Sequence, residues 1–165
     1  MLVKQINLGI VMGLLASGVA LAADNPTVAV PGAETGTSPA DVVKNAPKGS
    51  LKNPYNPGQQ DIVAQGHELF QSYSCSGCHG SSGSGGRCPQ LNGDVWFFGM
   101  EDDTLFRLVT LGSVDLQKAG FQQLGKPPEI PMPPFGNVIN SDDELWKIIT
   151  WIRSIYKGDP KKKIG

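Results

Sequence analysis

The chain has 165 residues, among them 21 glycines, 13 prolines and three cysteines, and its formal net charge is −1. Glycine and proline together make up roughly a fifth of it, which is high for a compact domain but below the ~25–30% that indicates disorder. The near-neutral charge argues against a nucleic-acid-binding protein, and three cysteines are too few for a disulfide scaffold.

Residues 1–22 have the pattern of a secretory signal peptide. Lys4 precedes an apolar run from about Leu8 to Leu21, which ends in small residues. The run is shorter than the ~20 residues that a membrane-spanning helix needs, so we expect cleavage after Ala22 rather than an uncleaved anchor. The mature protein is then expected in a bacterial periplasm, without a membrane span.

Residues 23–59 are predicted to form a Pro/Gly-rich N-terminal arm. The segment holds six prolines, and neither Phe nor Trp occurs in the chain before Phe70. So little apolar surface cannot offset the entropy of ordering the segment. We therefore expect an extended spacer or a partner-binding arm, laid over the domain near Leu51 and Tyr55.

Residues 60–158 are predicted to be the globular domain, followed by a basic tail at residues 159–165. All the Phe, Trp and Cys residues lie within the predicted domain. The three lysines of the tail at 161–163 are explained by simple solvation or by steering toward an acidic partner.

Three helices are predicted in this domain. Apolar side chains at helical spacing indicate helices at about 61–73 and 103–111. Gly112 is expected to end the second helix, and Ser141 and Glu144 form a capping box at the start of the third. No segment alternates as a strand does, so the fold class is all-α. Three short helices between Gly- and Pro-rich loops leave a core that something else must fill.

Cys75, Cys78 and His79 form a C-x-x-C-H run directly after the first predicted helix. Two thiols at this spacing can add to the two vinyl groups of a haem, and the adjacent imidazole can then bind its iron. A structural zinc site that also uses Cys88, a thioredoxin-like dithiol and chance are the alternatives. The export signal and the lack of a βαβ pattern favour haem attachment, and a haem would fill the core.

The second axial ligand has to come from elsewhere in the chain. Met132 lies in a segment with five prolines between Pro127 and Pro134, which is stiff and extended and can hold a thioether toward iron. Met100 and His67 are weaker candidates, because a packing methionine and an exposed helical histidine explain them. An open coordination position is the remaining alternative.

These residues resemble the class I c-type cytochromes over about residues 60–157. Gly66, Phe70 and Trp151 are similar to the contact at which the first and last helices cross in that family. The resemblance implies an all-α class I cytochrome c fold, with three or more short helices wrapped around one covalently bound haem c.

The same resemblance implies the roles of the site residues. Cys75 and Cys78 would carry the thioether bonds, and His79 and Met132 would be the axial ligands of the iron. The carbonyl of Pro89 would accept the other ring N–H of His79, which orients the imidazole. A Met/His pair raises the reduction potential and leaves no position for a substrate, so we expect an electron-transfer protein rather than an enzyme.

A narrower similarity is to cytochrome c(L)-type proteins, which accept electrons from PQQ-dependent methanol or alcohol dehydrogenases in the periplasm. It depends on Trp96 and on the run Trp-Ile-Arg-Ser-Ile-Tyr at residues 151–156, whereas residues 113–129 have no counterpart. It implies a one-electron carrier between such a quinoprotein dehydrogenase and a later cytochrome or an oxidase. A carrier or cytochrome subunit for another periplasmic redox enzyme, and a haem enzyme or ligand sensor with a labile sixth ligand, are the alternatives.

Cys88 departs from the family, which usually has glycine at this point of the loop. Buried packing beside the haem, pairing with another molecule and a redox role are the three interpretations of this thiol.

The acidic groups at 101–103 and 142–144 each open a predicted helix, and the helix dipole explains both.

Overall fold

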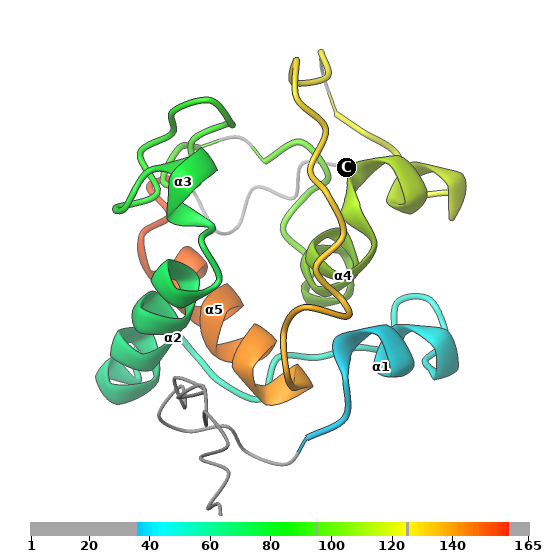
Figure 1. Ribbon diagram of the computed structural model, residues 1–165, viewed down its shortest axis with the longest axis horizontal. Coiled ribbons are helices and arrows are strands. Elements are labelled where there is room, and N and C mark those ends of the chain that lie inside the picture. The colour runs from blue at the N-terminus through cyan, green and yellow to red at the C-terminus, as the bar shows by residue number, and fades with distance from the viewer. Residues whose placement is uncertain (1–35, 95, 125, 159–165) are drawn as a thin grey trace, which may run out of the picture.

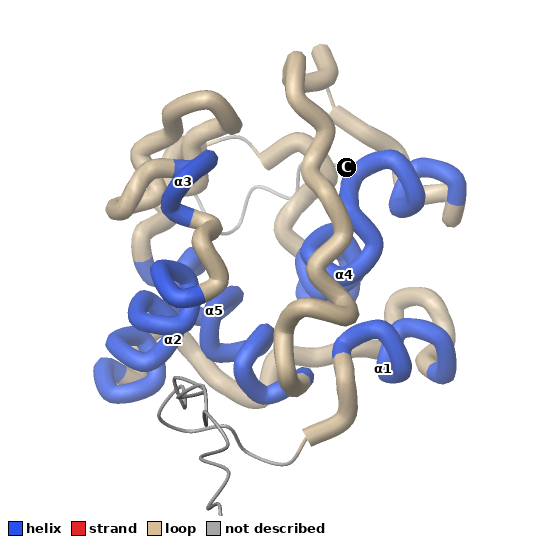
Figure 2. Tube along the Cα trace, viewed as in Figure 1, coloured by secondary structure: helices blue, strands red, loops and turns tan. Residues whose placement is uncertain are grey.

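The computed structural model describes residues 36–94, 96–124 and 126–158, and the predicted signal peptide and basic tail lie outside them. The described part of the chain is helical and contains no strand, as predicted, with long loops between the helices (Figure 2). Its helices are α1 (Pro39–Asn45), α2 (Gln60–Ser72), α3 (Ser76–His79), α4 (Asp102–Lys118) and α5 (Asp142–Ser154). None of the helices in these residues is long and apolar enough to cross a membrane.

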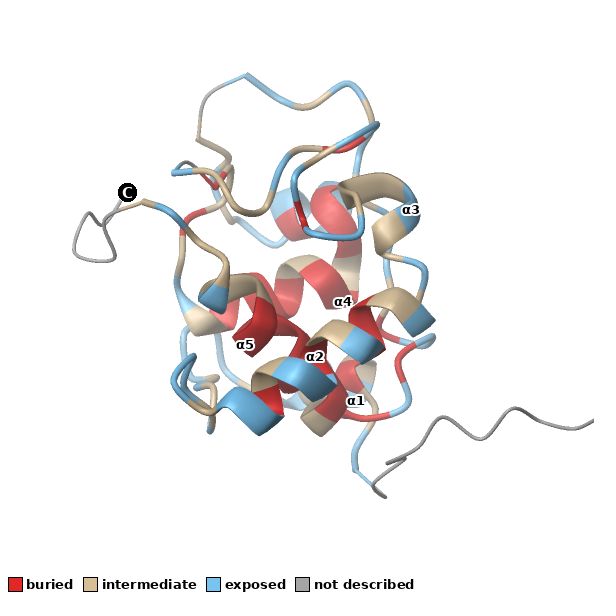
Figure 3. Ribbon diagram, turned by 90° about the vertical axis from the view of Figure 1, so that its left-hand side faces the viewer, coloured by how far each residue is buried: buried red, intermediate tan, exposed pale blue. Residues whose placement is uncertain are grey.

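The hydrophobic core lies where α2, α4 and α5 meet (Figure 3). Each of these helices carries an apolar face at helical spacing, which is why all three form here. The apolar side chains that are almost fully buried include Phe70, Phe106, Leu116, Ile139, Leu145, Ile148 and Ile149. The predicted helices at 61–73 and after Ser141 are confirmed as α2 and α5.

α2 and α5 cross in close contact (Figure 1). A Cβ added at Gly66 would lie 2.0 Å from the backbone oxygen of Lys147 and 3.0 Å from the Cβ of Trp151. Only glycine therefore lets the two helices approach this closely. The ring of Phe70 packs against Trp151 with a centroid distance of 4.4 Å. The contact expected between Gly66, Phe70 and Trp151 is confirmed.

A hydrogen-bond network also joins the end of α2 to the start of α5. The Tyr73 hydroxyl donates to Glu144 Oε2 at 2.5 Å and accepts from the backbone N–H of Asn140 at 3.1 Å. Burial, and then the hydrogen bond to Glu144, raise the pKa of Tyr73 to about 12, so the phenol stays protonated at neutral pH. Ser141 Oγ caps α5 by accepting from the Glu144 N–H at 3.2 Å. The expected capping box is therefore only half formed, because the Glu144 carboxylate bonds Tyr73 instead of the backbone N–H of Ser141.

Residues 23–35 of the predicted arm lie outside the described residues, and within residues 36–59 the expectation of an extended segment is wrong at α1. Ser38 accepts the N–H of Asp41 at 3.2 Å, Pro39 stands in the first turn, and helix α1 follows. Figure 1 places α1 beside α4. Leu51 and Tyr55 are partly buried against the core, as predicted.

The buried side chain of Arg107 in α4 explains why this segment is ordered. Its guanidinium donates to the backbone oxygens of Val43, Ala46 and Pro47, at 3.3, 2.9 and 2.9 Å. The same guanidinium pairs with Asp103 at 2.9 Å, and this pairing and backbone hydrogen bonds hold the pKa of Asp103 below its usual value against the opposing effect of burial. One buried cation thus acts as the hydrogen-bond donor to the free carbonyl groups at the end of α1. These hydrogen bonds help to order the segment, and the prediction from its few apolar residues did not include them.

Gly112 interrupts α4, with φ 74° and ψ 166°. The predicted end of the helix at this glycine is confirmed, but a second helical stretch continues to Lys118. The loop before α5 runs alongside α4 (yellow to orange in Figure 1) and is hydrogen-bonded to it near this interruption.

Gly66→Ala tests the helix crossing. The added methyl group meets backbone rather than the end of a flexible side chain, so we expect the free energy of unfolding to fall by about 1–3 kcal/mol. Gly77→Ala is the matched control, because a Cβ there meets no atom within 4 Å. Thermal unfolding of the purified variants, followed by circular dichroism, measures both effects. Equal stability of the two variants would contradict the close contact at Gly66.

Candidate functional site

A cavity of about 330 Å³ lies between the C-x-x-C-H turn, α4, α5 and the loop before α5. Its lining is almost entirely apolar, with side chains that include Phe70, Trp96, Leu105, Leu108, Val109, Ile148, Ile149 and Ile152. Protein interiors are close-packed and have few voids larger than a water molecule. A cavity of this size and lining is therefore suited to a large, flat, apolar group.

The C-x-x-C-H run folds into the single turn of α3. The backbone N–H groups of Cys78 and His79 both donate to the Cys75 oxygen, at 3.2 and 3.0 Å. Residues three and four positions apart share one side of a helix, so this turn presents its two thiols and its imidazole together. All three residues line the cavity.

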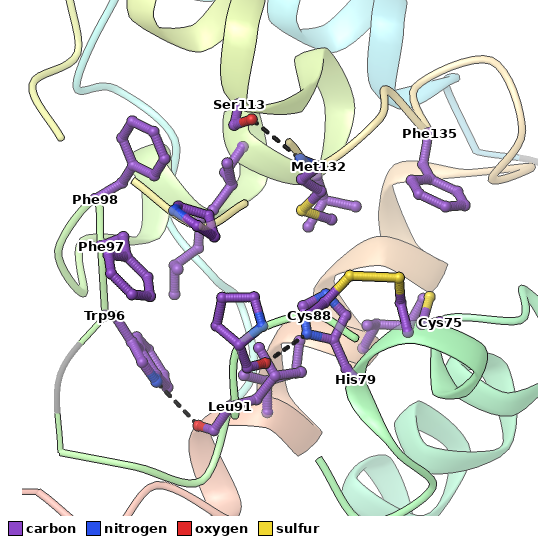
Figure 4. A pocket seen from close by; sticks show the side chains of 18 of the residues that line it. Cys75, His79, Cys88, Leu91, Trp96, Phe97, Phe98, Ser113, Met132 and Phe135 are labelled. Atoms are coloured by element: carbon purple, nitrogen blue, oxygen red, sulfur yellow. Dashed lines mark hydrogen bonds between the residues drawn. A yellow bond between two sulfur atoms is a disulfide. The ribbon is translucent and has the colours of Figure 1, made fainter. Parts of the chain in front are cut away.

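His79 is oriented by the loop that follows α3. Its Nδ1–H donates to the backbone oxygen of Pro89 at 2.8 Å (Figure 4). Burial lowers the pKa of His79, and the bond to Pro89 opposes this shift. The neutral imidazole then has its lone pair on Nε2, which is the form that binds a metal. The hydrogen bond that the family resemblance implied is present, while iron ligation by His79 stays a prediction.

Met132 is the candidate for the second axial position that the structure brings to the cavity. Figure 4 shows it entering from the α4 side, facing the wall that holds His79. Met100 is partly buried against the core and is absent from the cavity lining. His67 stacks on Trp151 at a ring distance of 4.7 Å and bonds the Ser81 oxygen. The packing role expected for Met100 is confirmed, whereas His67, which was expected to be exposed, is only partly exposed because it stacks on Trp151.

The three cysteines meet at one edge of the cavity. Cys78 and Cys88 are joined by a disulfide (Figure 4), a pairing within the chain that differs from the sequence interpretations of Cys88. Cys88 is also buried, as the packing interpretation expected. Cys75 is free, and burial raises the pKa of its thiol to about 11. Because one sulfur cannot hold a disulfide and a thioether together, attachment of a group through Cys78 requires this disulfide to be reduced.

The zinc alternative finds no support in the part of the chain that the structure describes. No group of three or more His, Cys, Asp or Glu side chains there is arranged to hold a metal ion. The thiols and imidazole instead line an apolar cavity, which suits covalent attachment of a large ring better than a four-ligand ion site.

The chain matches the family described as "Cytochrome C oxidase, cbb3-type, subunit III" over residues 61–152. It belongs to this family. The protein is therefore a c-type cytochrome with the class I cytochrome c fold, and the family implies covalently bound haem c. An apolar cavity with two cysteines and an imidazole at its edge fits that group once the Cys78–Cys88 disulfide is reduced.

No curated protein matches the chain. Among solved structures, it is similar to cytochrome CL from the marine methylotrophic bacterium Methylophaga aminisulfidivorans MPT, with 28% sequence identity and a TM-score of 0.46. The similarity covers 62% of this chain and 58% of that one. The chain thus matches somewhat more than half of the length of that cytochrome.

Several residues of the site were missed in the sequence. Phe97 and Phe98 line the cavity beside Trp96, and their position between the haem-binding motif and α4 is a signal that an aromatic count could have used. Trp96 itself is anchored by its Nε1–H, which donates to the Leu91 oxygen at 2.9 Å. Ser113 also lines the cavity, and nothing in its sequence surroundings distinguishes it.

Thiol labelling of the unfolded, unreduced protein distinguishes the two states of Cys78. In the haem-free chain we expect alkylation at Cys75 alone, because Cys78 and Cys88 are paired. In the haem-loaded chain we expect alkylation at Cys88 alone, because the other two sulfurs are thioethers. Peptide mass spectrometry locates the label, and the Cys88→Ser variant is the control, in which the haem-loaded form takes none. Haem-loaded protein with an unlabelled Cys88 would contradict attachment through Cys78.

Proposed function

We propose that this protein is a periplasmic one-electron carrier with one haem c, attached to Cys75 and Cys78 and ligated by His79 and Met132. The observation that carries the proposal is the lining of the apolar cavity, to which α3 and its N-cap residue bring the two cysteines and the imidazole, and the loop before α5 brings the thioether. The predicted signal peptide at residues 1–22 supports export.

Each residue of the site has a different role in electron transfer. When bound, the haem supplies the redox chemistry, a one-electron exchange at its iron. Pro89 holds His79 in one tautomer and orientation. The apolar lining would keep water away from the ring, and a methionine ligand together with a histidine would raise the reduction potential. Two protein ligands leave no open position for a substrate, which favours a carrier over an enzyme.

A quinoprotein methanol or alcohol dehydrogenase is the proposed electron donor, and a later cytochrome or an oxidase the proposed acceptor. The two segments that carry the similarity to cytochrome c(L)-type proteins contact each other. The rings of Trp96 and Tyr156 pack at a centroid distance of 4.8 Å, and the Tyr156 hydroxyl donates to the Asp94 oxygen at 3.0 Å. These segments therefore form one local unit at the edge of the cavity, rather than two unrelated matches.

A cytochrome subunit for a different periplasmic redox enzyme is the second candidate. The family match favours it, because that family is described by an oxidase subunit rather than by a free carrier. Both candidates use the same site and the same one-electron chemistry, and they differ in the partner.

Met132→Ala tests the ligand set. The oxidised haem protein should show the far-red charge-transfer band of methionine bound to ferric iron, and the variant should lose it. Its reduction potential should fall by a substantial part of the ~0.8 V range that axial ligands span, because the thioether favours the reduced iron. Met100→Leu is the control and should keep the band. A wild-type protein without the band would point to an open site and a haem enzyme or sensor.

Stopped-flow reduction distinguishes the two partners. We expect the oxidised protein to be reduced by a purified quinoprotein alcohol dehydrogenase, with rates that fall as salt is raised if charges steer the encounter. The Met132→Ala variant, with its lower potential, should accept electrons more slowly. No reduction of the wild-type protein at micromolar concentrations would reject the dehydrogenase and favour the subunit role.

A further inference from the structure

We propose that Ser113, presented by the interruption of α4 at Gly112, is a positioning residue that holds Met132 in place as an iron ligand. The proposal rests on the ligand set of the proposed function, and it adds a residue to which neither the family resemblance nor the sequence gave a role. Near Gly112, α4 and the loop before α5 are joined by backbone hydrogen bonds.

The interruption of α4 releases backbone groups that a continuous helix would use itself. In an unbroken helix the N–H of Ser113 would bond the oxygen of Val109. Instead, the Ser113 N–H donates to the Met132 oxygen at 3.0 Å, and the Val109 oxygen accepts from the Phe135 N–H at 2.9 Å. The loop has thus taken the place of the missing helical bond.

The next carbonyl of α4 is satisfied in the same way. The Thr110 oxygen accepts from the Gly136 N–H at 3.0 Å. Pro133 and Pro134 have no N–H to give, so the loop is held at the residues on either side of the two prolines. The backbone groups that the interruption frees in α4 are therefore bonded by the loop residues that flank the two prolines.

The side chain of Ser113 completes the contact. Its Oγ accepts the backbone N–H of Met132 at 3.0 Å (Figure 4), so both backbone polar groups of Met132 bind the same residue. Ser113 is only 6% exposed and lines the cavity beside Met132. Because successive side chains of an extended segment point to opposite sides, fixing both groups of one residue also fixes which side chain enters the cavity.

Glycine at position 112 makes this approach possible for two reasons. Its φ of 74° is one that other residues rarely adopt. In addition, a Cβ at this position would lie 2.6 Å from the Met132 oxygen and 2.9 Å from the carbonyl carbon of Pro133. The backbone of α4 therefore touches the ligand loop directly at Gly112 and bonds it at Ser113.

Binding of free imidazole to the oxidised haem protein measures how firmly Met132 is held. Imidazole can bind the iron only after Met132 has left, so its apparent affinity reports the fraction of molecules in which the ligand is released. Ser113→Ala removes one hydrogen bond to the ligand residue and should raise this apparent affinity about three- to tenfold. The far-red methionine band should remain, and its loss on raising the pH should begin at a lower pH than in the wild type.

Two further variants separate positioning from general destabilisation. Ser113→Thr keeps the hydroxyl and should restore the wild-type affinity for imidazole. Ser72→Ala removes a serine hydroxyl that bonds the Glu68 oxygen at 2.8 Å on the exposed face of α2, and it should leave the affinity unchanged. Thermal unfolding of all variants shows how much each loses in overall stability.

The outcomes for the role of Ser113 differ from those for the proposed ligand set. A wild-type protein without the methionine band would overturn the His79/Met132 ligand set itself. A wild-type band together with an unchanged imidazole affinity in Ser113→Ala would overturn the role of Ser113 alone. If Ser113→Thr or Ser72→Ala raised the affinity for imidazole as much as Ser113→Ala does, the role of Ser113 would also be overturned. The hydroxyl at position 113 would then not be the group that holds Met132.

Discussion

The helices of this protein surround an apolar cavity that their own side chains do not fill. α2, α4 and α5 bury only part of their apolar faces against one another, and side chains such as Leu108 and Ile152 line the cavity instead. Burial of apolar surface is the main favourable contribution to folding, so a group with large apolar faces completes this core. In a c-type cytochrome that group is the haem, which is then part of the hydrophobic core as well as the redox centre.

Around this core, buried polar groups order loops that have few apolar side chains of their own. Arg107 binds the carbonyls at the end of α1, and Tyr73 and Glu144 join α2 to α5. Ser113 bonds both the N–H and the oxygen of the Met132 backbone. Arg107 and Ser113 belong to α4 and bond the backbone of other segments, and Tyr73, directly after α2, bonds the start of α5. The helices therefore position the Gly- and Pro-rich segments, and glycines such as Gly66 and Gly112 stand where one stretch of backbone closely approaches another.

The sequence predicted the features that depend on local patterns. Helical spacing located α2 and α5, the C-x-x-C-H motif located the cavity edge, and Met132 was singled out by its prolines. Three features escaped prediction because they depend on contacts distant in sequence. α1 is ordered by Arg107, more than 60 residues away. The continuation of α4 beyond Gly112 is packed through Leu116, which is fully buried. Cys78 pairs with Cys88 because the loop between them folds back.

An anomalous difference map, collected at the iron absorption edge from crystals of the haem-loaded protein, would locate the iron and its ligands. We expect one iron peak inside the apolar cavity, flanked by His79 and Met132, with continuous density from the ring to Cys75 and Cys78. A peak outside the cavity, a second peak, or an iron ligated by a residue other than these two would contradict it.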